Sequence, residues 1–114
     1  MPNHTVRIVA KYIENDSPAG NYRFVLLCGL DDNGRIAEGE WLGYTHNNDQ
    51  HFPFLLQREP YPCIFLGGEE KYFEPTSIFQ SLIKVDSTFT VSSSPSSNEE
   101  WSAVYKITSV HTLL

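Results

Sequence analysis

Two histidines, an aspartate and a cysteine are the side chains of this chain with the right chemistry to bind a metal ion. His46 and His51 lie close together in the sequence with Asp49 between them, and Cys63 follows downstream. Imidazole, carboxylate and thiolate groups all coordinate zinc. A structural zinc site normally adds a paired cysteine motif, however, and this chain has none. We therefore interpret the segment as a polar surface loop and predict neither a metal nor another cofactor.

Glu38 and Glu40 are the residues whose spacing suits acid–base catalysis. On a β-strand they would share one face and lie about 7 Å apart, within the range in which two carboxylates work as acid and base. Two glutamates on the solvent side of a strand are more often a solvated face. Cys63 and His51 would supply a nucleophile and a base, but the sequence identifies neither the third group nor the oxyanion donors that such a pair requires. We predict no catalytic residue.

The acidic residues of the chain, taken together with its aromatic residues, indicate a surface for a protein partner. The net charge is −6. That charge disfavours direct binding to nucleic acid, which depends on Lys and Arg, and it complements a partner with a basic surface. Aromatic side chains commonly anchor such interfaces. The same charges also suit the ordinary surface of a soluble protein. The predicted interaction surface consists of Asp31, Glu38, Glu40, Tyr44 and Trp101.

A β-hairpin over residues 21–44 is expected to carry four of these five residues. Two apolar runs flank Asn33-Gly34, a pair that suits the two positive φ values of a type I′ turn. This turn would set Leu26 opposite Trp41. The face toward the core would then carry Phe24, Leu26, Cys28 and Trp41.

Several other segments have the composition of β-strands. Residues 4–14 alternate apolar and polar side chains, which is the pattern of a half-buried strand. Residues 87–92 and 102–111 are rich in β-branched and aromatic residues. Prolines punctuate the segments at 54–57 and 63–66, so we expect short strands at a sheet edge there. The expected connections are loops at 15–20, 45–51 and 93–100 and a turn at 67–70.

Residues 76–84 predict one short helix. Ser77 and Gln80 have the spacing of a capping box, and the segment carries an apolar stripe. A helix of about two turns does not persist alone, so it should pack against the sheet. The residues of the stripe are Ile78, Phe79, Leu82 and Ile83.

These elements predict a single α+β domain over residues 1–114, because a chain of 114 residues has room for one core. The domain should be mainly antiparallel β. We expect a strongly bent sheet or small β-barrel of about five to seven strands with one short helix near residues 76–84. Two cysteines, Cys28 and Cys63, are too few for a disulfide framework, so both are expected to be free and buried.

The sequence does not establish a function, and two interpretations remain. The first is a small acidic, non-enzymatic module that binds a protein with a basic surface. The alternative is a small-ligand-binding or catalytic β-barrel with an aromatic-lined pocket. Homo-oligomerisation through an edge strand is a further expectation. Because the chain lacks a cationic, apolar leader and any run of about 20 apolar residues, we expect a cytoplasmic protein that contacts no membrane. The residues suggested for the pocket are Phe54, Tyr61, Phe65 and Tyr72.

Overall fold

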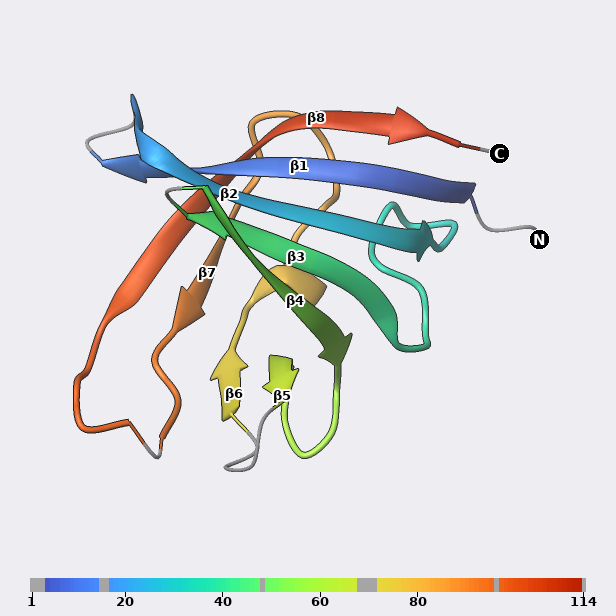
Figure 1. Cartoon of the computed structure of the whole chain (residues 1–114). Helices are drawn as coiled ribbons and strands as arrows, with labels where there is room; N and C mark the ends of the chain where they lie inside the picture. Colours follow the sequence, from blue (N-terminus) through green and yellow to red (C-terminus); the bar gives the residue numbers. More distant parts are fainter. Residues whose placement is uncertain (1–3, 15–16, 48, 68–71, 96, 114) are drawn as a thin grey trace.

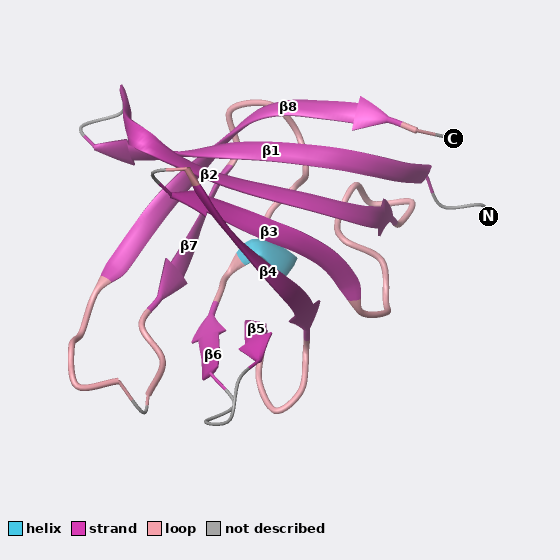
Figure 2. Cartoon of the chain, viewed as in Figure 1, coloured by secondary structure: helices cyan, strands magenta, loops and turns pink. Residues whose placement is uncertain are grey.

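Eight antiparallel β-strands follow one another along the chain (Figures 1 and 2). The structure, a computed structural model, describes residues 4–14, 17–47, 49–67, 72–95 and 97–113. One 3₁₀ turn, η1, interrupts the succession of strands between β6 and β7. The elements are β1 (His4–Glu14), β2 (Ser17–Leu30), β3 (Trp41–Asn47), β4 (Gln50–Gln57), β5 (Cys63–Gly67), β6 (Tyr72–Pro75), η1 (Ile78–Gln80), β7 (Thr88–Ser92) and β8 (Ser102–Thr112).

The sheet curls into a nearly closed barrel. Its strand order is β6-β5-β4-β3-β2-β1-β8-β7, so every strand pairs with its neighbours in sequence except β6 with β7, and β1 also pairs with β8 (Figure 1). Among the described residues, β6 and β7 are joined by the isolated bridge of Thr76 with Val91, which hydrogen bonds to Thr90 reinforce. The predicted antiparallel barrel is confirmed. The predicted number of strands was too low.

Alternating side chains from these strands fill one half of the barrel interior. Val6, Ile8 and Ala10 of β1 are buried, as the alternation over residues 4–14 predicts. The predicted inward side chains of β2 are also buried: Phe24, Leu26 and Cys28 are completely inaccessible to solvent. Four aromatic rings pack together at the centre, with centroids 4.9 to 5.7 Å apart. These rings belong to Phe24, Phe54, Phe89 and Tyr105.

The connection between β2 and β3 is a long loop and not the predicted tight turn. The Asp31 carboxylate accepts hydrogen bonds from the backbone N–H groups of Asn33 (2.8 Å) and Arg35 (3.0 Å). Within this turn only Gly34 has a positive φ, of 78°, so a type I′ turn does not form. The competing interaction is the side chain of Asp31, which folds the backbone around itself.

The register of the hairpin is consequently shifted by two residues. Leu26 lies opposite Gly43 and not opposite Trp41. A shift of two residues leaves every side chain on its expected face, and for this reason the inward assignment of β2 survives. Trp41 is half-buried against the core, and its indole N–H donates to the carbonyl oxygen of Ala37 at 3.0 Å.

The predicted helix over 76–84 is wrong apart from the single turn η1. Ser77 does not cap a helix; its hydroxyl oxygen accepts a hydrogen bond from the Thr90 backbone N–H at 2.9 Å. Ile78 and Ile83 are buried, so the apolar stripe does reach the core. The tie between Ser77 and β7 holds the segment in a bend where a capped helix cannot start.

The loops at one end of the barrel form a plug. The Ile83 backbone N–H donates to the Gly34 carbonyl oxygen at 2.8 Å, which joins the β6–β7 connection to the β2–β3 loop. The Arg58 guanidinium donates to the carbonyl oxygen of Ile36 at 3.0 Å and lies 4.0 Å from the ring centroid of Phe79. We call this set of loops, residues 31–40, 58–62 and 76–87, the plug.

The loop predicted at 45–51 is instead the end of a β-hairpin. His46 pairs with His51 and Asn47 with Gln50, so β3 and β4 run further than their apolar residues do. The edge position predicted for 63–66 is also wrong, because β5 lies between β4 and β6. Most of the turn predicted at 67–70 lies outside the described residues. Residues 93–100 connect β7 to β8 as predicted.

Candidate ligand-binding cavity

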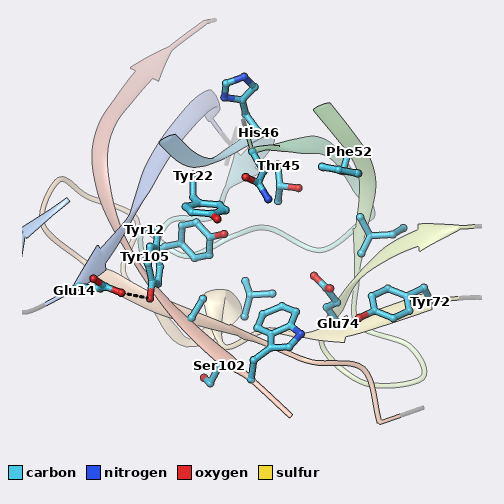
Figure 3. Close-up of a pocket in the computed structure, with 15 residues that line it drawn as sticks. Tyr12, Glu14, Tyr22, Thr45, His46, Phe52, Tyr72, Glu74, Ser102 and Tyr105 are labelled. Carbon is cyan, nitrogen blue, oxygen red and sulfur yellow. Dashed lines mark hydrogen bonds between the residues drawn. The ribbon is translucent and has the colours of Figure 1, made fainter. Parts of the chain in front are cut away.

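The end of the barrel opposite the plug opens into a cavity of about 910 Å³ (Figure 3). The described residues at its mouth belong to β3, β4 and the segment that leads into β8. All eight strands contribute at least one lining side chain. The cavity therefore exists only because the sheet closes on itself, and no local segment of the sequence encodes it.

The lining residues continue the inward alternation of the core strands toward the mouth. Tyr12 follows Ala10 on the inner face of β1, and Tyr22 precedes Phe24 on β2. Phe52 lies two residues before the buried Phe54 on β4. The buried aromatic rings form the floor, and the next inward layer above them leaves space at the centre. The barrel is thus half core and half cavity.

Aromatic side chains dominate this inner layer. The ring of Tyr12 makes edge-to-face contacts with Tyr22 at 5.7 Å and with Tyr105 at 6.2 Å, measured between centroids. Figure 3 shows these three tyrosines together on one wall. Phe52 and Trp101 lie at the mouth and remain 41% and 40% exposed. Large aromatic surfaces left open to solvent in a concave site are typical of ligand pockets.

Glu74 lies on the opposite wall, on β6 beside Tyr72 (Figure 3). Its partner across the strand pair is the fully buried Ile64, which places both side chains on the inner face. Burial raises the pKa of the Glu74 carboxyl to about 7, although a hydrogen bond with the Tyr72 hydroxyl acts in the opposite direction. A carboxyl with this pKa can hold or release a proton at neutral pH.

Besides burial, the charge of the Glu74 carboxylate affects the pKa of Tyr105. Burial raises the pKa of its hydroxyl to about 12, and the charge of Glu74 contributes to this rise. Tyr105 is almost entirely buried at the floor of the cavity. The carboxyl on one wall therefore influences the phenol of the other wall through a weakly screening medium.

Asn47 carries a buried acceptor that has no partner among the described residues. Its side-chain oxygen Oδ1 is inaccessible to solvent and accepts no hydrogen bond. Leaving such a group unsatisfied costs about 1 to 3 kcal/mol. Asn47 lines the cavity at the end of β3. By contrast, the Glu14 carboxylate accepts a hydrogen bond from the Tyr12 hydroxyl at 3.1 Å (Figure 3).

The structure brings together only two of the four residues considered for a metal. The rings of His46 and His51 lie side by side with centroids 4.6 Å apart. Asp49 is exposed in the β3–β4 turn, where its φ is 70°, and Cys63 is buried in the core. Across the described ranges, no three His, Cys, Asp or Glu side chains gather into a possible metal site.

The two cysteines are free and buried, as predicted. Burial raises the pKa of the Cys28 thiol to about 12. Burial also raises the pKa of the Cys63 thiol, against the lowering effect of a hydrogen bond with Gln57. Neither sulfur is a poised nucleophile, because the reactive form of cysteine is the thiolate.

The predicted interaction surface is split between the two ends of the barrel. Glu38 and Glu40 are exposed in the plug, and the Asp31 carboxylate in the same loop is occupied by backbone N–H groups. Tyr44 is half-buried on β3 with its ring 5.1 Å from that of His51. Trp101 lines the cavity, and the segment that carries it, before β8, lies at the opposite end of the sheet from the β2–β3 loop (Figure 1).

Of the aromatic residues predicted to line a pocket, one does so. Tyr72 lines the cavity, whereas Phe54 lies beneath it in the core. Tyr61 and Phe65 line no part of the cavity; their rings pack against Phe73, with centroid separations of 6.4 and 4.8 Å.

Glu74 is a cavity residue that the sequence interpretation missed. The available signal was an acidic residue within the aromatic segment Tyr72–Pro75, YFEP, which was not recognised as a strand. Asn47 was missed for a related reason, because its polar neighbours resembled a loop.

Across the part of the chain that the structure describes, no helix has the length and apolar character needed to cross a membrane. Comparison with known proteins finds no family model, no curated protein and no solved structure that matches this chain.

Proposed function

We propose that this protein binds a small organic molecule inside the open half of its barrel. The observation that carries the proposal is the cavity of about 910 Å³ above a filled core. Pockets for small molecules commonly have volumes of about 300 to 1,000 Å³ and combine apolar walls with a few placed polar groups. Here tyrosine rings form the walls, and Glu74 and Asn47 are the polar groups.

The aromatic rings at the mouth supply the driving force for binding. Phe52 and Trp101 are each about two-fifths exposed, so a ligand that covers them removes apolar surface from water. The cavity needs little rearrangement for this, because ladders of backbone hydrogen bonds hold most of its walls.

The acidic protein-binding module inferred from the sequence is less well supported. Its proposed surface needs acidic and aromatic side chains side by side. The β2–β3 loop, which carries Glu38, and the segment before β8, which carries Trp101, lie at opposite ends of the sheet (Figure 1). A catalytic barrel would use the same cavity as a ligand-binding barrel. The two functions differ in whether the bound compound is recovered unchanged.

A pair of neighbouring substitutions on β8 tests the proposal. Ala103 lines the cavity, and the adjacent Val104 is 38% exposed and does not line it. Ala103→Trp should fill the cavity, and Val104→Trp should add the same side chain outside it. A library of small aromatic and aliphatic compounds is screened by native mass spectrometry, which also reports whether each bound compound keeps its mass.

We expect the wild type and Val104→Trp to bind the same compounds and Ala103→Trp to bind none of them. Thermal unfolding of each variant shows that it is folded. If the wild type binds no compound, or if Ala103→Trp binds as well as Val104→Trp, the proposed function is wrong. A bound compound that changes mass would assign the cavity to catalysis.

A further inference from the structure

The cavity has an excess of hydrogen-bond acceptors with negative charge. Its described lining residues include the carboxylates of Glu14 and Glu74 but neither Lys nor Arg. Glu14 already accepts a hydrogen bond from Tyr12. Glu74 faces the cavity on the opposite wall (Figure 3). A ligand with a carboxylate or phosphate would face Glu74 with like charge, which disfavours anionic ligands.

An ionised carboxylate such as that of Glu74 only accepts hydrogen bonds. A ligand that pairs with Glu74 therefore needs N–H or O–H donors, and a positive charge on the donating atom strengthens the pair. A protonated amine carries up to three donors on one positively charged atom.

The tyrosine wall is suited to the same kind of group. Tyr12 makes edge-to-face contacts with both Tyr22 and Tyr105, and this arrangement turns their ring planes in different directions. Aromatic faces attract cations through the ring quadrupole, and the attraction is stronger where water is excluded. The rings also supply apolar surface for the rest of the ligand.

We propose that the ligand is an organic cation, namely a protonated amine joined to an aromatic or aliphatic body. Its ammonium group pairs with Glu74, and its body lies against the tyrosine wall. This inference rests on the proposed function, because it names the chemical class that the same cavity takes.

The ionisation of Glu74 gives the proposal a pH signature. Burial raises the pKa of this carboxyl to about 7, so it is largely protonated at pH 6 and largely ionised at pH 8. Affinity for a cation should follow the ionised fraction and rise about tenfold over this interval. The other titratable groups lining the cavity are Glu14, His46, Tyr12, Tyr22, Tyr72 and Tyr105.

His46 also lines the cavity. It lies at the rim, where its Nδ1 atom is 3.3 Å from the guanidinium of Arg23. Glu74→Gln should abolish most of the pH dependence of cation binding, and His46→Gln should leave most of it in place.

Three compounds that share one body and differ in charge provide the test. Isothermal titration calorimetry at pH 8 compares 2-(1-naphthyl)ethylamine, 2-(1-naphthyl)ethanol and 1-naphthylacetate. We expect the amine to bind the wild type at least tenfold more tightly than the alcohol, and the acetate to bind most weakly. Glu74→Gln should remove the advantage of the amine. Glu38→Gln, an exposed control in the plug, should leave the order unchanged.

The inference is overturned if the alcohol or the acetate binds the wild type as tightly as the amine, or if Glu74→Gln keeps the preference. If the alcohol or the acetate binds, and Ala103→Trp blocks its binding but Val104→Trp does not, the cavity remains the binding site and only the ligand class is wrong. If none of the three compounds binds, the inference also falls. The proposed function falls with it only when the wider library gives no binding either.

Discussion

Replacement of Glu74 by glutamine should stabilise the protein at alkaline pH and remove part of the pH dependence of its stability. Burial raises the pKa of this carboxyl from 4.5 to about 7 in the folded chain, so the folded state holds the proton more tightly than the unfolded state. The stability that this carboxyl contributes is complete below pH 4.5 and is lost as the pH rises toward 7. Above that pH the folded chain has to bury an ionised carboxylate.

The size of the effect follows from the two pKa values. They differ by about 2.5, which corresponds to about 3 kcal/mol at about 1.36 kcal/mol for each pKa unit. Glu74 is only half-buried, so water screens its charge, and we expect a gain of about 1 to 2 kcal/mol for Glu74→Gln at pH 8. In a chain of this length such a gain raises Tm by roughly 4 to 8 °C. At pH 4.5 and below the two proteins should be about equally stable, because glutamine resembles a protonated glutamate in shape.

Urea unfolding followed by tryptophan fluorescence measures this prediction between pH 4 and pH 8. Glu38→Gln serves as the control, because Glu38 is exposed in the plug and its replacement should change the free energy of unfolding by less than about 0.5 kcal/mol. All other titratable groups are common to wild type and each variant, so their contributions cancel in the differences. The reasoning is refuted if the difference between Glu74→Gln and wild type does not grow with pH, or if Glu38→Gln shows the same growth.

Three further predictions concern the core, the plug and the thiols. Gly43→Ala should lower the free energy of unfolding in urea by about 3 kcal/mol. A Cβ at this position would overlap the Val25 carbonyl oxygen and approach Phe54 Cζ to 2.7 Å. A loss below about 1 kcal/mol would contradict this close packing. Arg58→Met should lower the free energy of unfolding by about 1 to 2 kcal/mol, because the hydrogen bonds to carbonyl oxygens of the plug are lost. Backbone hydrogen exchange should become faster in the plug alone. Unchanged exchange would show that Arg58 does not stabilise the plug. Neither buried cysteine should react with a thiol reagent at pH 8 until the chain unfolds, and rapid labelling of the native protein would contradict their burial.

Much of the barrel could be predicted from local patterns in the sequence. The alternation in residues 4–14 predicted β1, because a strand with one buried face repeats every two residues. The β-branched and aromatic residues of 102–111 predicted β8. The inward face of β2 was also correct, although the tight turn that supported it was not. A register error of two residues does not change which face of the sheet a side chain occupies, since it moves each side chain along the strand and not to the other face.

The parts that could not be predicted depend on contacts between distant segments. The capping-box spacing at Ser77 indicated a helix, but in the fold its hydroxyl bonds to Thr90 of β7. The polar residues at the end of β3 resembled a loop because the alternation there sets polar side chains against a cavity and not against a core. Tyr12 has the same inward pattern whether the barrel is filled or hollow above it, so the cavity has no local signature.

The predictions of a cytoplasmic location, of a basic protein partner and of homo-oligomers stay predictions. The strand expected to pair between copies, 63–66, already has neighbours on both sides in β4 and β6. The strands at the two limits of the sheet are β6 and β7.

The incomplete junction between β6 and β7 ties the dynamics of the barrel to the protonation of its cavity. Seven strand junctions are ladders of backbone hydrogen bonds, while the described residues of this one are joined by the bridge of Thr76 with Val91 and by hydrogen bonds of Thr76 and Ser77 with Thr90. We therefore expect the wall to part here at the lowest free energy. Glu74 lies on β6 two residues from the bridge, so parting of the wall admits water to its carboxylate. Loss of its proton and opening of the junction favour each other, and the barrel should fluctuate more at this junction as the pH rises through 7.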